Sequence, residues 1–328
     1  MTDSPAIRLV FFGTPQYAVP CLEALHADRR FEVLIVVTQP DRPSGRGHKL
    51  ISLPVKASAR HHGIPVIQPE TLRDESVRDH LRSFDADLFV VAAYGLLLSQ
   101  AVLDIPRAGC VNLHASLLPH YRGAAPINAA ILNGDTETGM TLMVMERGLD
   151  TGPIIAAERI GIGPEDTTES LTASLAEVGA ELALETFPDF AAGAIVPQPQ
   201  PEGATVVRRL TKADGQIDWN QRAEYIERQV RAMWPWPRAW TSLNGETVQI
   251  HASRVAGLDL DLRPGAIAIH DGHQMLVGCG AGVLLVVSAQ SAGGKPLFGA
   301  DLVRHYKRHS GMVFDEASAL EIPFIRPG

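Results

Sequence analysis

Short apolar runs alternate with amphipathic stretches over the first 190 residues. The runs are rich in β-branched residues and predict strands at 7–12, 32–38, 88–93 and 110–114. The run at 88–93 does not alternate with polar residues, which is typical of a strand covered on both faces. Helical spacing predicts helices in between, at 17–27, 54–62, 73–83 and 124–132. This order predicts an α/β domain with a Rossmann-like, mostly parallel sheet.

The pattern changes in the second half of the chain. Strands at 141–145 and 154–160 flank a turn at Asp150-Thr151-Gly152, and a helix at 168–187 closes the first domain. The prolines at 197, 199 and 201 exclude regular helix and central strand. Beyond them, one helix and several short strands punctuated by glycine predict a small OB-like β-barrel. We therefore expect a catalytic domain at 1–190, a linker at 191–206 and a C-terminal domain at 207–328.

Composition narrows the class of protein. The 328 residues are 45% hydrophobic and 20% charged, which suits a globular chain with a sizeable core. The three cysteines are far apart and lack metal-binding spacing, so neither a disulfide framework nor a metal site is expected. The N-terminus has no basic leader, and no apolar run is long enough to cross a membrane. We expect a cytoplasmic monomer that does not bind membranes.

The charge is distributed unevenly. Residues 1–204 hold 15 Lys and Arg against 25 Asp and Glu, whereas residues 205–328 hold 14 against 12. The second half is mildly basic and can accept a nucleic acid, although its charge does not demand one.

A strand-to-helix turn at Gly13-Thr14-Pro15 raises the possibility of a nucleotide cofactor. A dinucleotide site needs three glycines so that the backbone can approach the pyrophosphate, and only Gly13 is present. We therefore prefer a plain tight turn.

The candidate reacting centre follows the strand at 110–114. Asn112 and His114 are two residues apart, so their side chains share one face of an extended strand. An amide and an imidazole at the carboxyl end of a parallel strand suit acyl transfer, where fixed donors stabilise a developing oxyanion. Asp150 lies in a turn near the same edge and can orient His114 and relay a proton. Each residue alone is more often a cap, a core histidine or a turn residue, and only the combination favours catalysis.

The residues around this centre resemble those of the folate-dependent formyltransferases. The resemblance rests on 112–119 (Asn-Leu-His-Ala-Ser-Leu-Leu-Pro) and 121–126 (Tyr-Arg-Gly-Ala-Ala-Pro). It continues at 12–15, 38–43, 149–152, 210–212, 217–219 and 234–237, and so covers nearly the whole chain. These outer motifs are similar to those of the branch of the family that formylates methionyl-tRNA.

The resemblance implies a function and assigns residues to it. The co-substrate would be 10-formyltetrahydrofolate, the acceptor the α-amine of initiator methionyl-tRNA, and no metal would take part. Catalysis would fall to Asn112, His114 and Asp150. Folate would contact Ser116, Leu117, Leu118, Pro119, Ala93, Tyr94 and Gly95.

Two basic regions are candidates for binding tRNA. The loop at 38–53 would be a solvated surface loop on charge alone, but the resemblance favours a tRNA contact through Arg42, Arg46 and Lys49. In the C-terminal half, the candidate face contains Lys295, Arg304, Lys307 and Arg308. His48 and His120 stand where relatives commonly carry Lys or Arg, so tRNA affinity could depend on pH. We expect Trp234 and Trp236 to pack in the core or between domains.

Two other functions stay open at this point. The same chemistry could serve a different amine, such as a nucleotide-linked sugar amine or glycinamide ribonucleotide. Alternatively, the chain could be an RNA-binding protein without activity, which the intact trio of Asn112, His114 and Asp150 argues against.

Overall fold

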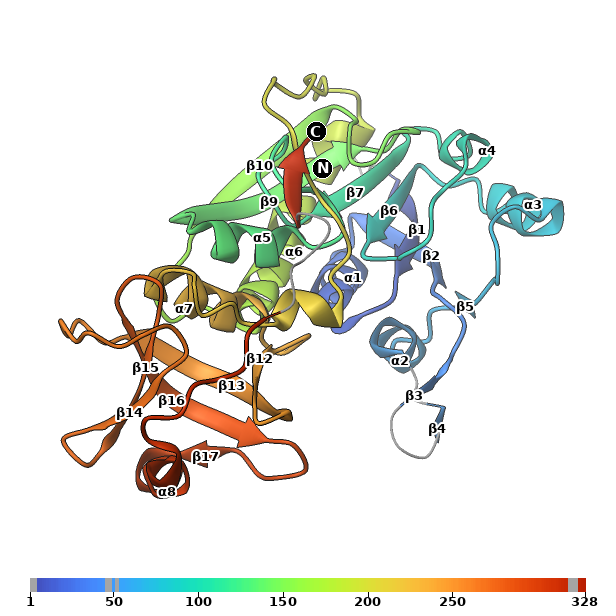
Figure 1. Cartoon of the computed structure of the whole chain (residues 1–328). Helices are drawn as coiled ribbons and strands as arrows, with labels where there is room; N and C mark the ends of the chain where they lie inside the picture. Colours follow the sequence, from blue (N-terminus) through green and yellow to red (C-terminus); the bar gives the residue numbers. More distant parts are fainter. Residues whose placement is uncertain (1–4, 45–48, 51–52, 318–323) are drawn as a thin grey trace.

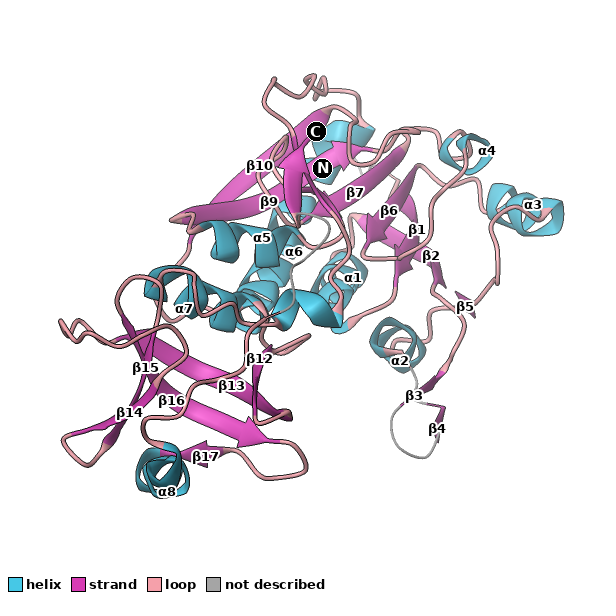
Figure 2. Ribbon diagram, in the orientation of Figure 1, coloured by secondary structure: helices cyan, strands magenta, loops and turns pink. Residues whose placement is uncertain are grey.

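A mixed seven-stranded sheet forms the centre of the first domain in the computed structural model (Figures 1 and 2). The structure describes residues 5–44, 49–50, 53–317 and 324–328. Five strands run parallel, and β9 and β10 close one edge as an antiparallel pair. Their order is β10 (Ile154–Gly161), β9 (Glu137–Val144), β7 (Cys110–His114), β6 (Leu88–Ala92), β1 (Ile7–Gly13), β2 (Phe31–Val37) and β5 (Val66–Ile67).

Helices cover both faces of this sheet. Alternate strand residues, such as Leu9 and Val90, pack against α1 (Val19–Ala27), α2 (Pro54–His61), α5 (Pro126–Asn133) and α6 (Thr168–Ala191). Their neighbours, such as Val10 and Phe89, pack against α3 (Glu75–Ser83) and α4 (Gln100–Leu103) on the other face. Both faces of the strands are therefore buried, which explains why their sequences are continuously apolar.

A smaller antiparallel sheet with its own core forms most of the C-terminal part. Its strands are β12 (Ala239–Leu243), β13 (Glu246–Val255), β16 (Val283–Ser291), β15 (Gln274–Gly278) and β14 (Ile267–His270), in spatial order, with β17 (Leu297–Phe298) beside β16. Two helices flank it, α7 (Ala223–Ala232) and α8 (Gly299–Tyr306). The predicted fold class, a parallel-dominated α/β domain followed by a small β domain, is confirmed.

The two parts meet along α5 and α7. The Ala232 carbonyl at the end of α7 accepts hydrogen bonds from Asn128 Nδ2 at 2.6 Å and Thr168 Oγ1 at 2.8 Å. In return, Arg228 Nε donates to the Leu132 carbonyl at 3.1 Å. Polar groups at helix ends are thus satisfied across the contact.

The linker returns to the first domain, which the sequence pattern did not predict. Its last residues form β11 (Thr205–Val207), which pairs with β8 (Arg122–Gly123) on one side and β18 (Ile325–Pro327) on the other. Val207, Leu210 and Phe324 pack into the first domain's core. Figure 1 shows the red C-terminal strand against that domain, away from the other C-terminal strands. The domain boundaries stay a prediction. Residues from the beginning and the end of the C-terminal part pack with the first domain.

Gly123 permits the close approach of β11. A Cβ atom at Gly123 would lie 2.3 Å from the Val207 carbonyl oxygen, and its φ is +110°. We expect Gly123→Ala to destabilise the protein by about 1–3 kcal/mol, because the alanine would strain the backbone at a positive φ and its Cβ would displace β11. Gly203→Ala is the matched control, because its φ is +92° and a Cβ atom there would meet nothing within 4 Å. Equal losses of stability for both variants in urea unfolding would contradict this account.

Candidate active site

Asn112 and His114 lie at the carboxyl end of β7, in the interior of the sheet. Asn112 is opposite Met143 and His114 is opposite Thr141 across the antiparallel pair with β9. The His114 side chain is 5% exposed. Asn112 is half-buried, and within the described part of the chain its side chain makes no hydrogen bond. Its amide is therefore available to a ligand at this edge.

Asp150 reaches this edge from the turn between β9 and β10. Its Oδ2 atom lies 3.6 Å from His114 Nδ1, an ion-pair distance longer than a hydrogen bond. The same oxygen accepts a hydrogen bond from the Gly123 backbone N–H at 2.8 Å. Asp150 has a φ of +51°, which is uncommon for a residue with a side chain. The structure thus brings together the imidazole and the carboxylate that the sequence singled out.

The other ring nitrogen of His114 is also fixed. Nε2 lies 3.0 Å from the Tyr121 carbonyl oxygen, which only accepts, so Nε2 donates. A neutral ring then carries its hydrogen on Nε2 and leaves Nδ1 free to exchange a proton on the side of Asp150. Tyr121 is itself anchored, because its hydroxyl donates to Asp135 at 2.6 Å. Burial, followed by the nearby Asp135 carboxylate, raises the pKa of Tyr121.

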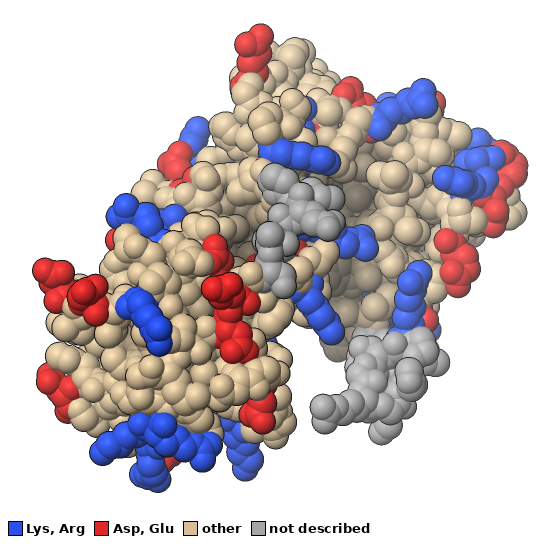
Figure 3. All heavy atoms as spheres, viewed as in Figure 1, with Lys and Arg blue, Asp and Glu red and all other residues tan. Residues whose placement is uncertain are grey.

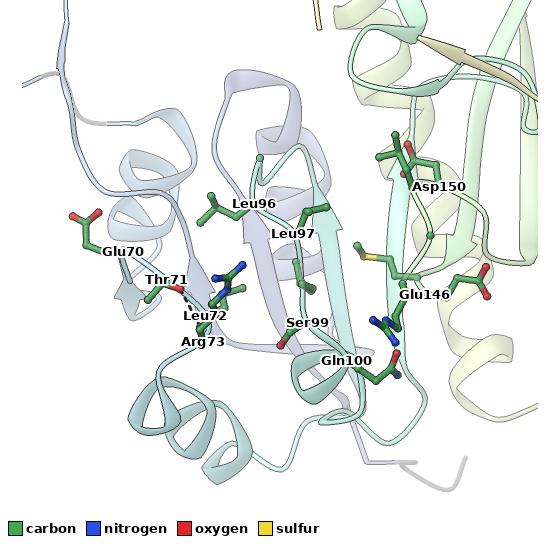
Figure 4. A pocket seen from close by; sticks show the side chains of 16 residues that line it. Glu70, Thr71, Leu72, Arg73, Leu96, Leu97, Ser99, Gln100, Glu146 and Asp150 are labelled. Carbon is green, nitrogen blue, oxygen red and sulfur yellow. Dashed lines mark hydrogen bonds between the residues drawn. The ribbon is translucent and has the colours of Figure 1, made fainter. Parts of the chain in front are cut away.

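A pocket of about 710 Å³ opens beside Asp150 (Figure 4). Figure 4 shows the loop carrying Leu96, Leu97 and Ser99 between the Thr71–Arg73 side and the segment carrying Glu146 and Asp150. Leu97 and Leu149 are 88% and 52% exposed, so apolar side chains stand at the pocket without covering partners. A cavity of this size, with an apolar wall and a few polar groups, suits an organic ligand.

Gly95 and Asp150 are the predicted site residues that line this pocket. Tyr94 packs its ring against Phe12 in the core, and Ala93 is exposed beside it. Two hydrogen bonds hold the Ser116–Pro119 loop in place. Ser116 Oγ donates to the His120 carbonyl at 2.6 Å, and Thr141 Oγ1 donates to the Ser116 carbonyl at 2.6 Å. The folate contacts of these residues stay a prediction.

Most of the residues that line the pocket were not predicted from the sequence. They lie in three segments, at 70–73, 96–100 and 145–149. Three consecutive leucines directly after Tyr94-Gly95 were a partial signal: Leu97 is 88% exposed at the pocket, whereas Leu98 lies in the core and Leu96 packs against it.

The predicted tRNA contacts lie on separate surfaces. Arg42 is exposed, whereas Arg46, His48 and the side chain of Lys49 fall outside the described part of the structure. Figure 3 shows a group of basic side chains at the outer end of the C-terminal part. Arg304 lies in α8, Lys307 and Arg308 lie in the 3₁₀ turn that follows, and Lys295 is exposed before β17.

The two tryptophans behave differently. Trp234 contacts the first domain, where its Nε1 donates to Glu169 at 3.1 Å, as expected for packing between domains. The same expectation was wrong for Trp236, which is 52% exposed. It lies in the turn between α7 and β12.

The described ranges hold neither a metal-binding cluster nor a membrane-spanning helix. No group of three or more His, Cys, Asp and Glu side chains in those ranges could hold a metal ion. Within the same ranges, no helix has the length and apolar character that a membrane crossing requires.

Comparison with known protein families gives the class of the protein. The formyl transferase domain matches residues 7–187, and the formyl transferase C-terminal domain matches residues 209–307. Both halves of the chain are thus those of a formyl transferase.

Curated relatives narrow the class further. The methionyl-tRNA formyltransferase of Geobacter sulfurreducens is 43% identical over 96% of this chain and 99% of its own length. That of Xanthomonas axonopodis pv. citri is 48% identical over 90% of this chain and 96% of its own. The chain belongs to the methionyl-tRNA formyltransferase family, which confirms the resemblance inferred from its motifs.

Solved structures share the fold at low sequence identity. WlaRD, a sugar 3N-formyl transferase, has a TM-score of 0.64 at 17% identity, covering 89% of this chain and 100% of its own. The methionyl-tRNA formyltransferase from Clostridium thermocellum has a TM-score of 0.53 at 15% identity, covering 77% of this chain and 95% of its own.

The carboxylate of Asp150 provides a direct test of the site. We expect Asp150→Asn to lower turnover by a factor on the order of 10² or more, the scale of a lost acid–base partner. The amide oxygen can still accept from Gly123, so the fold should persist. Asp135→Asn is the control, because that carboxylate holds the same loop through Tyr121 without facing His114. Near-normal turnover by Asp150→Asn in a formyl-transfer assay would exclude the role assigned to Asp150.

Proposed function

We propose that this enzyme transfers the formyl group of 10-formyltetrahydrofolate to the α-amine of initiator methionyl-tRNA. The observation that carries this proposal is the approach of Asp150 Oδ2 to His114 Nδ1 at 3.6 Å, beside the free amide of Asn112. Its relatives support the same activity, because proteins named methionyl-tRNA formyltransferase align with this chain over nearly their whole lengths.

The chemistry begins when the α-amine attacks the formyl carbon. The carbonyl oxygen gains negative charge, which the Asn112 amide stabilises as a donor. His114 Nδ1 accepts the proton that the amine loses, and the Asp150 carboxylate stabilises the resulting imidazolium. The protonated Nδ1 then donates a hydrogen bond toward the oxyanion and gives its proton to N10 of the folate as the carbon–N10 bond breaks. Tetrahydrofolate and the formylated amine are the products, so atoms and charges balance.

The pocket beside Asp150 is the proposed folate site. Its exposed leucines offer a surface to an aromatic ring, and its mouth reaches the carboxylate at the reacting centre. Gly95 lines this pocket, and contacts of Ala93, Tyr94 and Ser116–Pro119 with the folate are part of the proposal. Solved structures of the same fold include HypX in complex with tetrahydrofolic acid, with a TM-score of 0.61 at 17% identity, covering 94% of this chain and 48% of that chain.

A tRNA acceptor explains the C-terminal part better than a small amine does. Arg304, Lys307 and Arg308 follow one another in α8 and the 3₁₀ turn after it, and Lys295 is exposed before β17, in a domain outside the sheet that carries the reacting centre. Figure 3 shows basic side chains grouped at one end of this domain. A small amine would have no use for distant cations, whereas a tRNA carries phosphates over that span. Arg42, Arg46 and Lys49 are proposed contacts on the catalytic side.

We also propose that the protein is a monomer and works in a reducing compartment. The three cysteines are free and buried, and burial raises the pKa of both Cys21 and Cys279 to about 12. Thiols protected in this way suit a reducing compartment such as the cytoplasm.

Release of tetrahydrofolate from 10-formyltetrahydrofolate tests the function. We expect release to require charged methionyl-tRNA, with initiator tRNA preferred over elongator tRNA. A dTDP-linked amino sugar and glycinamide ribonucleotide are the competing acceptors. Faster release with either small amine would replace the tRNA proposal, and no release with any acceptor would refute formyl transfer.

Salt dependence tests the proposed tRNA face. We expect Lys307→Gln with Arg308→Gln to raise the KM for tRNA and to reduce the slope of log affinity against log salt by about 1 per lost phosphate contact. Arg159→Gln is the control, because this cation is exposed on β10 and pairs with Glu137. Slopes that match the control would remove residues 307 and 308 from the tRNA face.

A further inference from the structure

The proline-rich linker runs directly beneath the turn that carries Asp150. Gln198 forms a backbone bridge with Ile154, at 2.7 Å and 2.8 Å in the two directions. Two residues later, the half-buried Gln200 lies next to the turn. The linker is thus joined to the start of β10, just after the turn ends.

The Gln200 side chain connects two parts of the candidate site. Its Oε1 accepts from Arg122 Nε at 3.0 Å and from a terminal guanidinium nitrogen at 2.7 Å. Its Nε2 donates to the carbonyl oxygens of Asp150 and Gly152, both at 2.8 Å. Because a guanidinium only donates and carbonyls only accept, the amide has one orientation that satisfies every partner.

These contacts act on a strained position. Asp150 has a φ of +51°, and such a conformation costs a side-chain-bearing residue free energy unless its surroundings hold it. Gln200 holds the carbonyl of Asp150, while Gly123, next to Arg122, holds its carboxylate. Arg122 therefore links Gln200 to Gly123, the residue whose backbone N–H donates to the Asp150 carboxylate.

The linker reaches His114 by a second route. Thr205 Oγ1 accepts from the Tyr121 backbone N–H at 2.8 Å. The carbonyl of the same residue, Tyr121, accepts from His114 Nε2 at 3.0 Å. The linker thus contacts Asp150 directly through Gln200 and reaches His114 through one residue, Tyr121.

The prolines make the segment suited to this position. Pro197, Pro199 and Pro201 alternate with Gln198 and Gln200, and each proline fixes one backbone dihedral. The linker therefore loses less conformational entropy when it becomes ordered against the first domain, which favours an ordered segment over a flexible linker.

We propose that Gln200 is a positioning residue, which sets the approach of the Asp150 carboxylate to His114 by holding the turn at 150–152 to Arg122. The inference rests on the proposed catalytic roles of Asp150 and His114. It gives the linker a part in the reaction in addition to joining two domains.

Gln200→Glu isolates the donor function of the amide. A glutamate keeps the partner of Arg122 as an ion pair, but it cannot donate to the carbonyls of Asp150 and Gly152 and places negative charge against them. We expect kcat for tRNA formylation to fall 10-fold to 100-fold, with the KM values for folate and tRNA within about threefold of wild type. Gln198→Glu is the matched control, because that exposed side chain bonds only to the neighbouring Val196 carbonyl among the described residues.

Two further measurements separate positioning from general destabilisation. In Gln200→Ala, the imidazole NMR signals of His114, assigned with His114→Gln, should shift relative to wild type and to Gln198→Ala. The losses in kcat from Gln200→Ala and Arg122→Ala should be less than additive when combined, because both break the same connection. Equal melting temperatures for Gln200→Glu and Gln198→Glu would show that the loss of kcat comes from the site and not from lower stability.

The outcomes distinguish this inference from the proposed function. A wild-type enzyme that fails to formylate any methionyl-tRNA overturns the function, and the His114 signals still decide whether Gln200 positions the ring. An active wild type with Gln200→Glu equal to Gln198→Glu in kcat overturns the positioning role. Unchanged His114 signals in Gln200→Ala also overturn it.

Discussion

The arrangement of the candidate site depends on one hydrogen bond, from the Gly123 backbone N–H to the Asp150 carboxylate. This bond joins β8 to the turn between β9 and β10, and the carboxylate oxygen that accepts it is the one nearest His114. Only a residue without Cβ fits at 123, because β11 packs against it from the other side. The donor is therefore a backbone group held rigidly in place, which suits electrostatic catalysis better than a mobile side chain would.

The regular parts of the fold could be predicted because their causes are local. Buried parallel strands are continuously apolar, so β1, β2, β6 and β7 were recognised within one or two residues. The strand β9 begins at Glu137, earlier than the apolar run at 141–145, because pairing with β10 extends it through polar residues. Strand pairing of that kind is a tertiary effect, and a single sequence carries little sign of it.

The candidate site was predictable for a different reason. A spacing of two on a strand fixes that Asn112 and His114 share a face, and this holds whatever surrounds them. The pocket lining had no such rule, since the course of the loop at Leu96–Gln100 depends on contacts distant in sequence. The role of the linker was hidden as well. Two of the four hydrogen bonds of Gln200 go to backbone carbonyls, which every sequence contains at every position, and the other two go to Arg122, 78 residues away in the chain.

The two crossings between the domains are both attached to the reacting centre. The chain leaves the first domain through β11 and returns to it through β18; these two strands pair with each other, and β11 also pairs with β8. Because β8 contains Gly123, any force on the C-terminal part that moves β11 or β18 acts on the donor to Asp150. The contacts of Ala232 with Asn128 and Thr168 oppose such movement from the other end of the interface. A load that acts on both domains therefore passes through the same small sheet that holds the Asp150 carboxylate, which gives the placement of β11 and β18 a physical reason beyond closing the fold.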